Sequence, residues 1–404
     1  MDCNLVLIRQ SNHARFPILN FSSVPAILVL FGTLYYAVVQ TGLIIGLFRL
    51  KRPNSKQRPL VSIIVAARNE ERSLGALLES LLHQTYTNYE IIVVDDRSTD
   101  ATSEIIRSAQ KSDARLKLVM VRSKAVDMPP KKHALTEGIR ASKGPILCFT
   151  DADCLPERTW IESLVSFFDE GVGVVAGYSP YDVKLLSEGV SNRMGMRLLH
   201  AFVKGEEFKG AIWSAGSIGM NLAWLCTGRN LAYRRSVFDE VGGFEQIKMS
   251  VSGDDDLFLQ LIRRSTHWTI QYATSPESFV RTAPPESFAE FIQQRTRHFS
   301  AGKYFTYPMK AFFSLFHFSN LILFLGLLSV FFSYPLFQIA AIGFAVKLTF
   351  DLVLTISAIR IVLRTSVRRG LHLTDFLLTE ILYIFYNTFV GPLGFINTFK
   401  WKQD

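Results

Sequence analysis

The chain has 404 residues, of which 49% are hydrophobic, 12% aromatic and only 20% charged. With 32 phenylalanines it is too apolar for a disordered chain and too rich in Phe for an ordinary soluble enzyme, so a membrane protein is expected. The formal net charge of +9 suits anionic lipid headgroups, a nucleotide diphosphate or nucleic acid alike. The four cysteines show no CxxC spacing, which argues against a disulfide framework or a structural zinc site.

The first apolar run predicts a membrane-spanning helix over residues 24–48, preceded by an N-terminal segment, residues 1–23. Basic residues are denser after this span than before it, which places the following chain in the cytoplasm by the positive-inside bias. A cleaved signal peptide is the alternative. The run is longer than a signal-peptide core and starts late, which favours the spanning helix.

Three further spans are expected over residues 311–395, followed by a short tail, residues 396–404. Ser333-Tyr334-Pro335 predicts the turn between the first two of them. Four arginines between positions 360 and 369 then fall on the same side as the basic residues after the first span. The two charge counts therefore predict the same multi-pass topology.

Lys347 and Asp351 are charged residues four positions apart within one of these spans. A mutual pair is the least unfavourable arrangement for charges inside a membrane. The pair either marks a polar path for a lipid headgroup or is neutralised internally without a role in function.

Between the spans, residues 59–299 alternate strand and helix patterns, which predicts an α/β domain. Apolar runs predict buried strands, and the stretches between them predict helices. Strands are expected over residues 61–67, 89–94, 116–121 and 146–150, and helices from Leu74 onward and over residues 131–141 and 156–168.

Carboxylates follow two of these strands, as Asp95-Asp96 and as Asp151-Ala152-Asp153. In open parallel sheets, ligands bind at the carboxyl ends of the strands. Together with Asp254-Asp255-Asp256, these groups could gather around a hard divalent cation and a diphosphate. The chain has no Walker A loop and no GxGxxG motif, so a P-loop hydrolase or a dinucleotide enzyme is unsupported.

Each acidic group also has an ordinary structural explanation. Asp153 could cap the helix expected over residues 156–168. Asp254-Asp255-Asp256 precedes an apolar helical pattern, whose dipole would favour carboxylates there in any case. The functional alternative makes one of these three a general base, with its pKa raised by the neighbouring like charges.

Two further segments allow a functional and a structural explanation. Gln294-Arg295-Thr296-Arg297-His298 lies on an amphipathic stretch before the membrane, which is either a basic face at the headgroup level or a site where Arg297 binds a diphosphate. The uncharged residues 211–226, with Trp213 and Trp224, either hold a lipid acceptor at the bilayer surface or form a buried loop.

The order of these motifs resembles the family-2 glycosyltransferases with a GT-A fold, membrane-anchored like ceramide glucosyltransferases and hyaluronan-, chitin- or cellulose-type synthases. The similarity covers residues 59–299. It implies a Rossmann-like GT-A domain in the cytosol, ending in an interfacial helix and flanked by transmembrane helices.

The resemblance also implies a donor site at the strand ends. Its nucleotide-binding residues would be Ala66, Arg68 and Glu70 of the opening motif, Asp96 near the uracil, and Lys131 and Asp151. Ala66 stands where Pro is usual. Asp151 and Asp153 correspond to a DxD motif that holds Mg²⁺ or Mn²⁺, with Asp153 favoured as the direct ligand.

On the acceptor side, Asp254-Asp255 matches the family's Glu-Asp pair and gives Asp255 the role of general base, with Arg297 stabilising the leaving group. Acceptor residues would be Arg229, Asn230, Gln294 and His298. His298 stands where the family's QxxRW motif has Trp. That difference argues against a processive polymer synthase, in which the Trp forms part of the acceptor's stacking surface.

The implied activity is inverting, metal-dependent transfer of a sugar from a nucleotide sugar, expected to be a UDP-sugar, to a lipid or lipid-linked acceptor. A processive polysaccharide synthase is the runner-up, although four spans are few for a pore. A non-catalytic membrane scaffold would be expected to have lost acidic residues at one of the three sites, and none is lost. Nucleic acid is not an expected partner, because only the net charge fits it.

Overall fold

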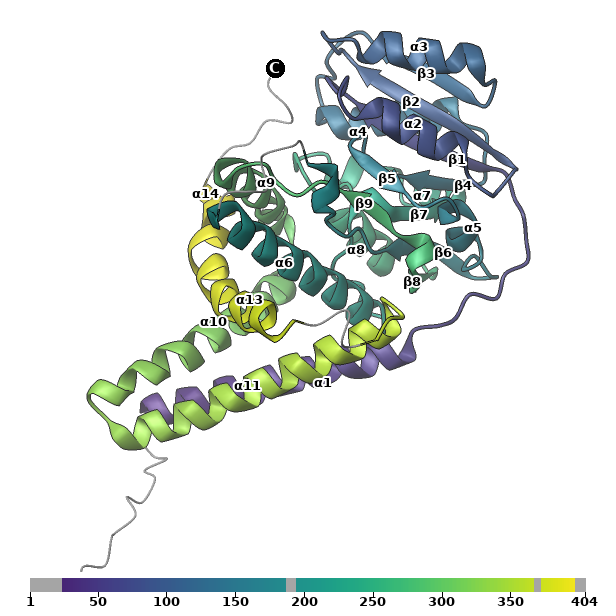
Figure 1. The fold of residues 1–404 in the computed structure, drawn as a ribbon. Coiled ribbons are helices and arrows are strands. Elements are labelled where there is room, and N and C mark those ends of the chain that lie inside the picture. Colours follow the sequence, from purple (N-terminus) through teal and green to yellow (C-terminus); the bar gives the residue numbers. More distant parts are fainter. Residues whose placement is uncertain (1–23, 187–193, 367–371, 397–404) are drawn as a thin grey trace, which may run out of the picture.

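The computed structural model describes residues 24–186, 194–366 and 372–396, and its central element is a seven-stranded sheet (Figure 1). The strands are β1 (Val61–Ala67), β2 (Tyr89–Asp96), β3 (Leu116–Val121), β4 (Ile146–Phe149), β6 (Val172–Gly177), β7 (Leu231–Arg234) and β8 (Thr269–Ala273). Their order across the sheet is β3-β2-β1-β4-β7-β6-β8. β7 runs antiparallel to its neighbours β4 and β6, and the other pairings are parallel.

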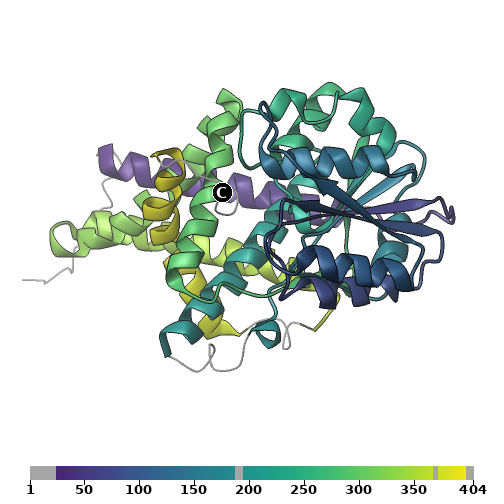
Figure 2. The same ribbon diagram turned by 90° about the horizontal axis from the view of Figure 1, so that it is seen from above.

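Helices cover both faces of the sheet, as the view from above shows (Figure 2). They are α2 (Leu74–Leu82), α3 (Thr102–Ser112) and α5 (Trp160–Val165) on one face, and α4 (Pro130–Ala141), α7 (Arg235–Glu240) and α8 (Asp256–Ser265) on the other. Because side chains alternate along a strand, Ile63 and Val65 of β1 pack on the first face and Ile64 on the second. The uninterrupted apolar run of β1 follows from this double burial.

The strands expected over residues 61–67 and 116–121 are confirmed by β1 and β3, and the other two differ by one or two residues at their ends. The helix expected over residues 156–168 is shorter than predicted. Its first residue belongs to β5 (Cys154–Pro156), which pairs antiparallel with β9 (Val280–Thr282). Asp153 therefore precedes a strand, and the alternative in which it caps a helix is wrong.

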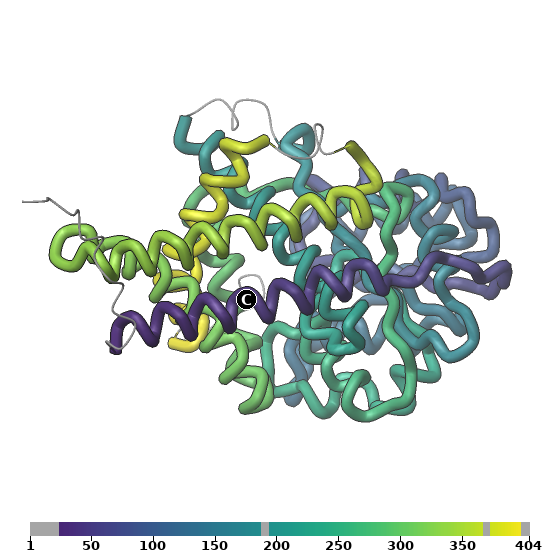
Figure 3. Tube along the Cα trace, turned by 90° about the horizontal axis from the view of Figure 1, so that it is seen from below, coloured from purple at the N-terminus to yellow at the C-terminus, as the bar shows by residue number. Residues whose placement is uncertain are grey.

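Four helical segments are long and apolar enough to cross a membrane: Val24–Arg49, Tyr307–Phe331, Tyr334–Ile361 and Leu373–Ile396. They contain α1 (Val24–Arg49), α10 (Tyr307–Leu327), α11 (Tyr334–Ile361), α13 (Leu373–Phe385) and α14 (Gly391–Ile396), with η7 (Leu328–Phe331) and the π-helical η8 (Tyr386–Val390). α1 and α11 lie side by side and extend away from the sheet (Figures 1 and 3). Large apolar side chains such as Leu34 and Phe48 are exposed on α1, which indicates contact with a membrane.

The turn predicted at Ser333-Tyr334-Pro335 lies where one apolar helix ends and the next begins. Ser333 is the residue before α11, and Pro335 lies in its first turn. Proline suits that position because the first N–H groups of a helix have no partner within it. The remaining short helices of the domain are η1 (Val183–Leu185), η3 (Gly228–Asn230), η4 (Glu245–Ile247), η5 (Pro276–Ser278) and η6 (Ala301–Tyr304).

One long helix, α6 (Met194–Gly219), connects the domain to the apolar helices by contacts with α1, α13 and β8. The loop expected over residues 211–226 is wrong in its first part, because residues 211–219 are the last turns of α6. Trp213 and Trp224 pack on each other and on Phe312 and Phe313 of α10. The segment thus forms a helix-packing surface at this junction.

α1 and α6 cross at unusually short range. A Cβ atom on Gly46 of α1 would overlap the carbonyl group of Gly216 of α6. Glycine at this crossing allows the two backbones to approach closely, as small residues do between membrane helices.

The predicted pair of Lys347 and Asp351 is confirmed, with 2.7 Å between the ammonium nitrogen and a carboxylate oxygen. It belongs to a larger buried network. Glu380 of α13 lies 2.8 Å from Lys347 and 2.5 Å from Lys209 of α6. Asp351 also accepts hydrogen bonds from Tyr36 and Gln40 of α1. Two cations and two anions therefore join four helices with no net charge.

We expect Lys347→Met to destabilise the protein, because it leaves Asp351 and Glu380 without one of their cations. Removing one partner of a buried pair costs about 3 kcal/mol or more of unfolding free energy. Thermal unfolding of the detergent-solubilised protein should show a lower melting temperature, and Lys347→Met with Asp351→Leu should recover part of the loss.

The matched control is Thr349→Val on the same helix, where the exposed hydroxyl bonds only to Ala345 one turn earlier. Equal melting temperatures for Lys347→Met and Thr349→Val would show that the network adds no net stability.

Candidate active site

The carboxyl ends of β2, β1 and β4 lie next to one another in the sheet, and the segments that follow them carry the predicted donor residues. Ala66 is buried within β1, beside Val94 of β2. Arg68 follows β1 directly and is also buried. The sheet therefore brings these residues to one edge.

The loops after β1 and β2 are joined to each other by hydrogen bonds. Asn69 adopts a left-handed backbone conformation, with φ of 54°, which Asn tolerates better than most residues. Its N–H donates to Ser98 Oγ at 3.0 Å, and its side-chain oxygen accepts from the Thr99 N–H at 2.8 Å. The Glu70 N–H donates to Thr102 Oγ1 at 2.8 Å. These bonds hold the two loops together as one platform.

Asp95 and Asp96 have different surroundings at the end of β2. Asp95 accepts hydrogen bonds from the Ser98 N–H and the Ser103 hydroxyl, so it supports the loop. Asp96 is buried and receives the Arg97 guanidinium through two hydrogen bonds of 2.8 and 3.2 Å. This pairing with Arg97 was not predicted from the sequence.

Lys131 joins two of the predicted acidic groups. Its ammonium nitrogen lies 3.0 Å from a carboxylate oxygen of Asp151 and 3.0 Å from one of Asp254. Burial alone would lower the pKa of Lys131, but the charges of Asp151, Asp254 and Asp255 outweigh it and hold that pKa above its usual value. Lys131, Asp151 and Asp254 also line a small hollow at the sheet edge.

Lys132, the next residue of α4, is a structural residue that the sequence did not single out. Its side chain is fully buried, and its ammonium group donates to the carbonyl oxygens of Ile247, Ser250 and Ser252 at 2.8, 2.6 and 3.0 Å. These bonds fix the loop that leads into Asp254, so α4 helps to position one of the two acidic partners of Lys131.

Asp153 is exposed at the same edge, two residues after Asp151. In the described part of the chain, no three His, Cys, Asp or Glu side chains are gathered as a metal cage. Asp151, which lines the hollow, and the exposed Asp153 nevertheless supply carboxylate oxygens, which suit a hard divalent cation that takes its other ligands from phosphate oxygens and water. The donor set thus fits a metal shared with a diphosphate.

Asp255 caps the start of α8, which is one of the two alternatives that the sequence allowed for it. Its carboxylate accepts from the Asp256 N–H at 2.8 Å at the start of α8, and from the Gly228 N–H at 3.0 Å. Burial and the negative charge of Asp254 raise the pKa of Asp255. A carboxylate with a raised pKa that is held by backbone donors is suited to proton transfer.

A cavity of about 160 Å³ lies beside Asp255. Its walls come from the end of β6, from α6, from the segment before η3 and from α9 (Phe288–Ser300). The charged and hydroxyl side chains that line it are Tyr178, Glu206, Glu207, Ser214, Thr227, Arg229, Ser252, Asp255, Asp256, Tyr272 and Arg295, together with His298. The predicted site residues did not include Glu206, Glu207 or Arg295, although two adjacent glutamates next to an apolar helical segment are an unusual pattern.

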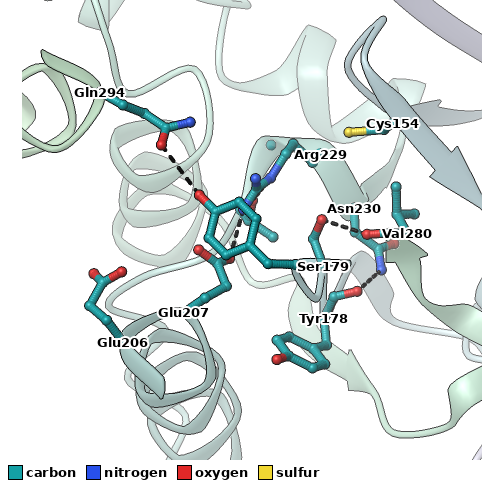
Figure 4. Close-up of polar contacts among 12 residues, drawn as sticks. Cys154, Tyr178, Ser179, Glu206, Glu207, Arg229, Asn230, Val280 and Gln294 are labelled. Atoms are coloured by element: carbon teal, nitrogen blue, oxygen red, sulfur yellow. Dashed lines mark hydrogen bonds and ion pairs between the residues drawn. The ribbon is translucent and has the colours of Figure 1, made fainter. Parts of the chain in front are cut away.

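Most charges in the cavity are already paired. Arg229 lies 2.7 Å from Glu207 (Figure 4), and its guanidinium also stacks over the ring of Tyr181. Arg295 forms ion pairs with Glu206 and, at 3.5 Å, with Glu207. Burial raises the pKa of Glu206 to about 7 even though Arg295 acts in the opposite direction.

The other predicted residues of α9 lie on the same side of the site. The Gln294 side-chain oxygen accepts a hydrogen bond from the Tyr181 hydroxyl at 3.3 Å. His298 has surface exposed toward the cavity, but desolvation and the charges of Arg295 and Arg297 lower its pKa, so it is neutral near pH 7. Arg297 adds to the positive charge that lowers the pKa of Asp151.

Asn230 is a structural residue, which corrects its predicted role in binding the acceptor. Its side chain is fully buried, and its nitrogen donates to the carbonyl oxygens of Tyr178 and Ser278, each at 2.8 Å. Its oxygen accepts from the Trp160 indole N–H at 2.9 Å. Because both amide hydrogens are used within the protein, the side chain has no donor left for an acceptor.

Residues 62–242 match the family described as glycosyl transferase family 2. The domain belongs to glycosyltransferase family 2. The matched segment begins in β1 and ends after α7, so it includes the donor edge of the site. Asp255 and α9 lie beyond it.

Similarity to individual glycosyltransferases extends further along the chain. This chain is 27% identical to the probable glycosyltransferase YdaM of Bacillus subtilis strain 168 over 331 residues, which cover 77% of this chain and 72% of that protein. It is 28% identical to the beta-monoglucosyldiacylglycerol synthase of Nostoc sp. strain PCC 7120 over 239 residues, 56% of this chain and 46% of the synthase. Matches to three other glycosyltransferases span 35% to 53% of their lengths.

The fold is similar to that of the mannosyltransferase PcManGT from Pyrobaculum calidifontis, a structure described in complex with GDP-Man and Mn²⁺. The TM-score is 0.50 and the sequence identity 20%, over 82% of this chain and 98% of that one. The protein is thus a glycosyltransferase with a GT-A fold and a Rossmann-like sheet, as the order of its motifs implied.

We expect Asn230→Asp to destabilise the glycosyltransferase domain, because it replaces two buried donors with a carboxylate that faces two carbonyl oxygens. Each buried polar group left without a partner costs about 1–3 kcal/mol of unfolding free energy. Asn88→Asp is the matched control, since Asn88 is exposed. A normal melting temperature with selective loss of acceptor binding would restore the role in acceptor binding.

The raised pKa of Asp255 predicts the acid side of the pH profile of turnover. A general base acts when deprotonated, so kcat/KM should fall as the pH falls through this pKa, above the ordinary Asp value of about 3.9. Asp254→Asn removes the neighbouring negative charge and should move this limb toward acid by about one pH unit. An unchanged limb in Asp254→Asn would assign it to another group.

Proposed function

We propose that this glycosyltransferase moves a single sugar, with inversion, from a nucleotide sugar to a lipid or lipid-linked acceptor at a membrane surface. One observation carries the proposal. Asp255 lines the cavity beside α6, while the adjacent Asp254 contacts Lys131 and, through it, Asp151. A general base has to lie between the donor and the acceptor in this way.

On the donor side, Ala66, Arg68, Glu70 and Asp96 would hold the nucleoside, expected to be uridine, on the platform formed by the loops after β1 and β2. Lys131 and Asp151 line the small hollow at the sheet edge, where the diphosphate would bind. The hydrogen bonds between the loops support this assignment, because they fix the platform before a ligand binds.

Asp151 and Asp153 would hold Mg²⁺ or Mn²⁺. Bound there, the cation would neutralise charge on the departing diphosphate. Two features support the assignment: the exposed carboxylate of Asp153 at the sheet edge, and the Mn²⁺ named for the similar mannosyltransferase structure.

The reaction then needs one proton acceptor and cationic groups near the leaving group. Asp255 takes the proton from an acceptor hydroxyl, whose oxygen forms a bond to the anomeric carbon. The bond between that carbon and the diphosphate oxygen breaks, and its electron pair leaves with the nucleoside diphosphate. Attack opposite the leaving group inverts the configuration, while Arg297 would stabilise the charge that develops on the diphosphate.

The arrangement of α6 supports a membrane-bound acceptor. α6 lines the cavity with Glu206, Glu207 and Ser214 and contacts α1 and α13, which belong to membrane-span candidates. A lipid held by these helices could therefore reach Asp255. The basic residues after α1 would keep the domain on the cytoplasmic side, where nucleotide sugars are available.

The purified full chain in lipid vesicles, given a panel of nucleotide sugars with Mg²⁺ or Mn²⁺, should transfer one sugar to an extracted lipid. Asp255→Asn should lower the rate by about 100-fold or more, because it removes the general base. The matched control Asp239→Asn changes an exposed residue of α7 and should keep wild-type activity.

The products distinguish this proposal from its alternatives. A ladder of long products would assign a processive synthase instead. Full activity of Asp255→Asn would remove Asp255 from the base role, and no turnover with any donor would favour a scaffold.

A further inference from the structure

The cavity beside Asp255 contains more acidic than basic groups. Its acidic side chains are Glu206, Glu207, Asp255 and Asp256, and its basic side chains are Arg229 and Arg295. His298 is uncharged near pH 7 for the reasons given above. An anion that entered this space would meet repulsion from the carboxylate of Glu207 in a low-dielectric environment. Burial raises the pKa values of Glu206, Asp255 and Asp256, which reduces the negative charge that these three carry near neutral pH.

Neither arginine is available to offset that repulsion. Glu207 lies 2.7 Å from Arg229 and 3.5 Å from Arg295, and Glu206 pairs with Arg295 as well. Both guanidinium groups also lie over the ring of Tyr181, at 5.3 and 5.8 Å from its centre. A phosphate could bind either arginine only by displacing a carboxylate that is already in place.

The wall contributed by α6 offers partners for hydroxyl groups. Glu207, Gly210, Ala211 and Ser214 line the cavity at the spacing of one helix face. Ser214 is 4% exposed, and its hydroxyl makes no hydrogen bond with any described residue. A buried hydroxyl without a partner costs free energy, so this group and the glutamates would gain most from a ligand that both donates and accepts hydrogen bonds.

We infer that the acceptor presents an uncharged, hydroxyl-bearing group to Asp255, such as a glycerol or sugar hydroxyl, and that Glu207 disfavours phosphate-bearing acceptors by neutralising Arg229, while Glu206 neutralises Arg295. This inference rests on the proposed function and names the acceptor class of the same site. The transferred sugar forms its bond to that hydroxyl oxygen, whose proton passes to Asp255.

The test uses the full-length protein in phosphatidylcholine vesicles at a surface charge kept constant with phosphatidylserine. The acceptors are dioleoylglycerol, dioleoylphosphatidylglycerol and dioleoylphosphatidic acid, which share their acyl chains, and free glycerol in solution. We expect kcat/KM for dioleoylglycerol to exceed that for each anionic lipid by about tenfold or more, since tenfold corresponds to about 1.4 kcal/mol.

Two variants test the residues. Glu207→Gln frees Arg229, while Arg295 keeps its pair with Glu206, and should lower the preference for dioleoylglycerol over dioleoylphosphatidylglycerol at least severalfold. Ser214→Ala should raise KM for dioleoylglycerol, because it removes a hydrogen-bonding partner of the acceptor. Glu79→Gln, at an exposed position on α2, should behave as wild type. Melting temperatures show whether each variant is folded.

Preference for either anionic lipid would overturn the inference and leave the proposed function in place. A Glu207→Gln variant that is folded and keeps the wild-type preference would overturn the role of Glu207. Transfer to free glycerol but to no lipid would support the hydroxyl class and overturn the lipid acceptor. No transfer to any of the four would overturn both proposals.

Discussion

The position of the active site relative to the apolar helices depends on ion pairs made by one helix, α6. Within four residues of each other, Glu206, Glu207 and Lys209 reach three different partners: Arg295 of α9, Arg229 before β7, and Glu380 of α13. A buried charge is tolerated only with a partner in good geometry, so each pair fixes one neighbouring element against α6. The domain and the helices that would span the membrane are held together by charge pairing as well as by apolar contact.

These pairs continue into a second group of charges. Glu380 is shared by Lys209 and Lys347, and Lys347 is shared by Glu380 and Asp351, which binds Tyr36 and Gln40 of α1. Because Glu380 and Lys347 each have two charged partners, moving one helix would leave a charge on another helix unpaired in a low-dielectric surrounding. Breaking only part of such a network costs much free energy, because it leaves buried charges unpaired. This favours a single arrangement of α1, α6, α11 and α13.

The sequence was most informative where structure depends on local patterns. Alternation and β-branched runs located β1 and β3 to the residue, and the rule that ligands bind at strand ends located Asp151 and Asp153. It failed where a residue's environment is set by a distant partner. Asn230 reads as a polar loop residue, but Trp160, Tyr178 and Ser278 surround it. The roles of the two glutamates likewise depend on distant partners. Glu207 pairs with Arg229, 22 positions later, and Glu206 pairs with Arg295, 89 positions later.

The two halves of the site therefore depend on different kinds of residue. The proposed donor edge is made by loops that follow parallel strands, and it lies within the segment that matches the family. The proposed acceptor side combines α6 with Asp255 and α9, and these last two lie outside that segment. Donor chemistry can stay constant while charges on α6 and α9 change, because no strand-end loop has to move. Two relatives with the same donor edge could then differ in acceptor through residues such as Glu207 alone, without any change in the sheet.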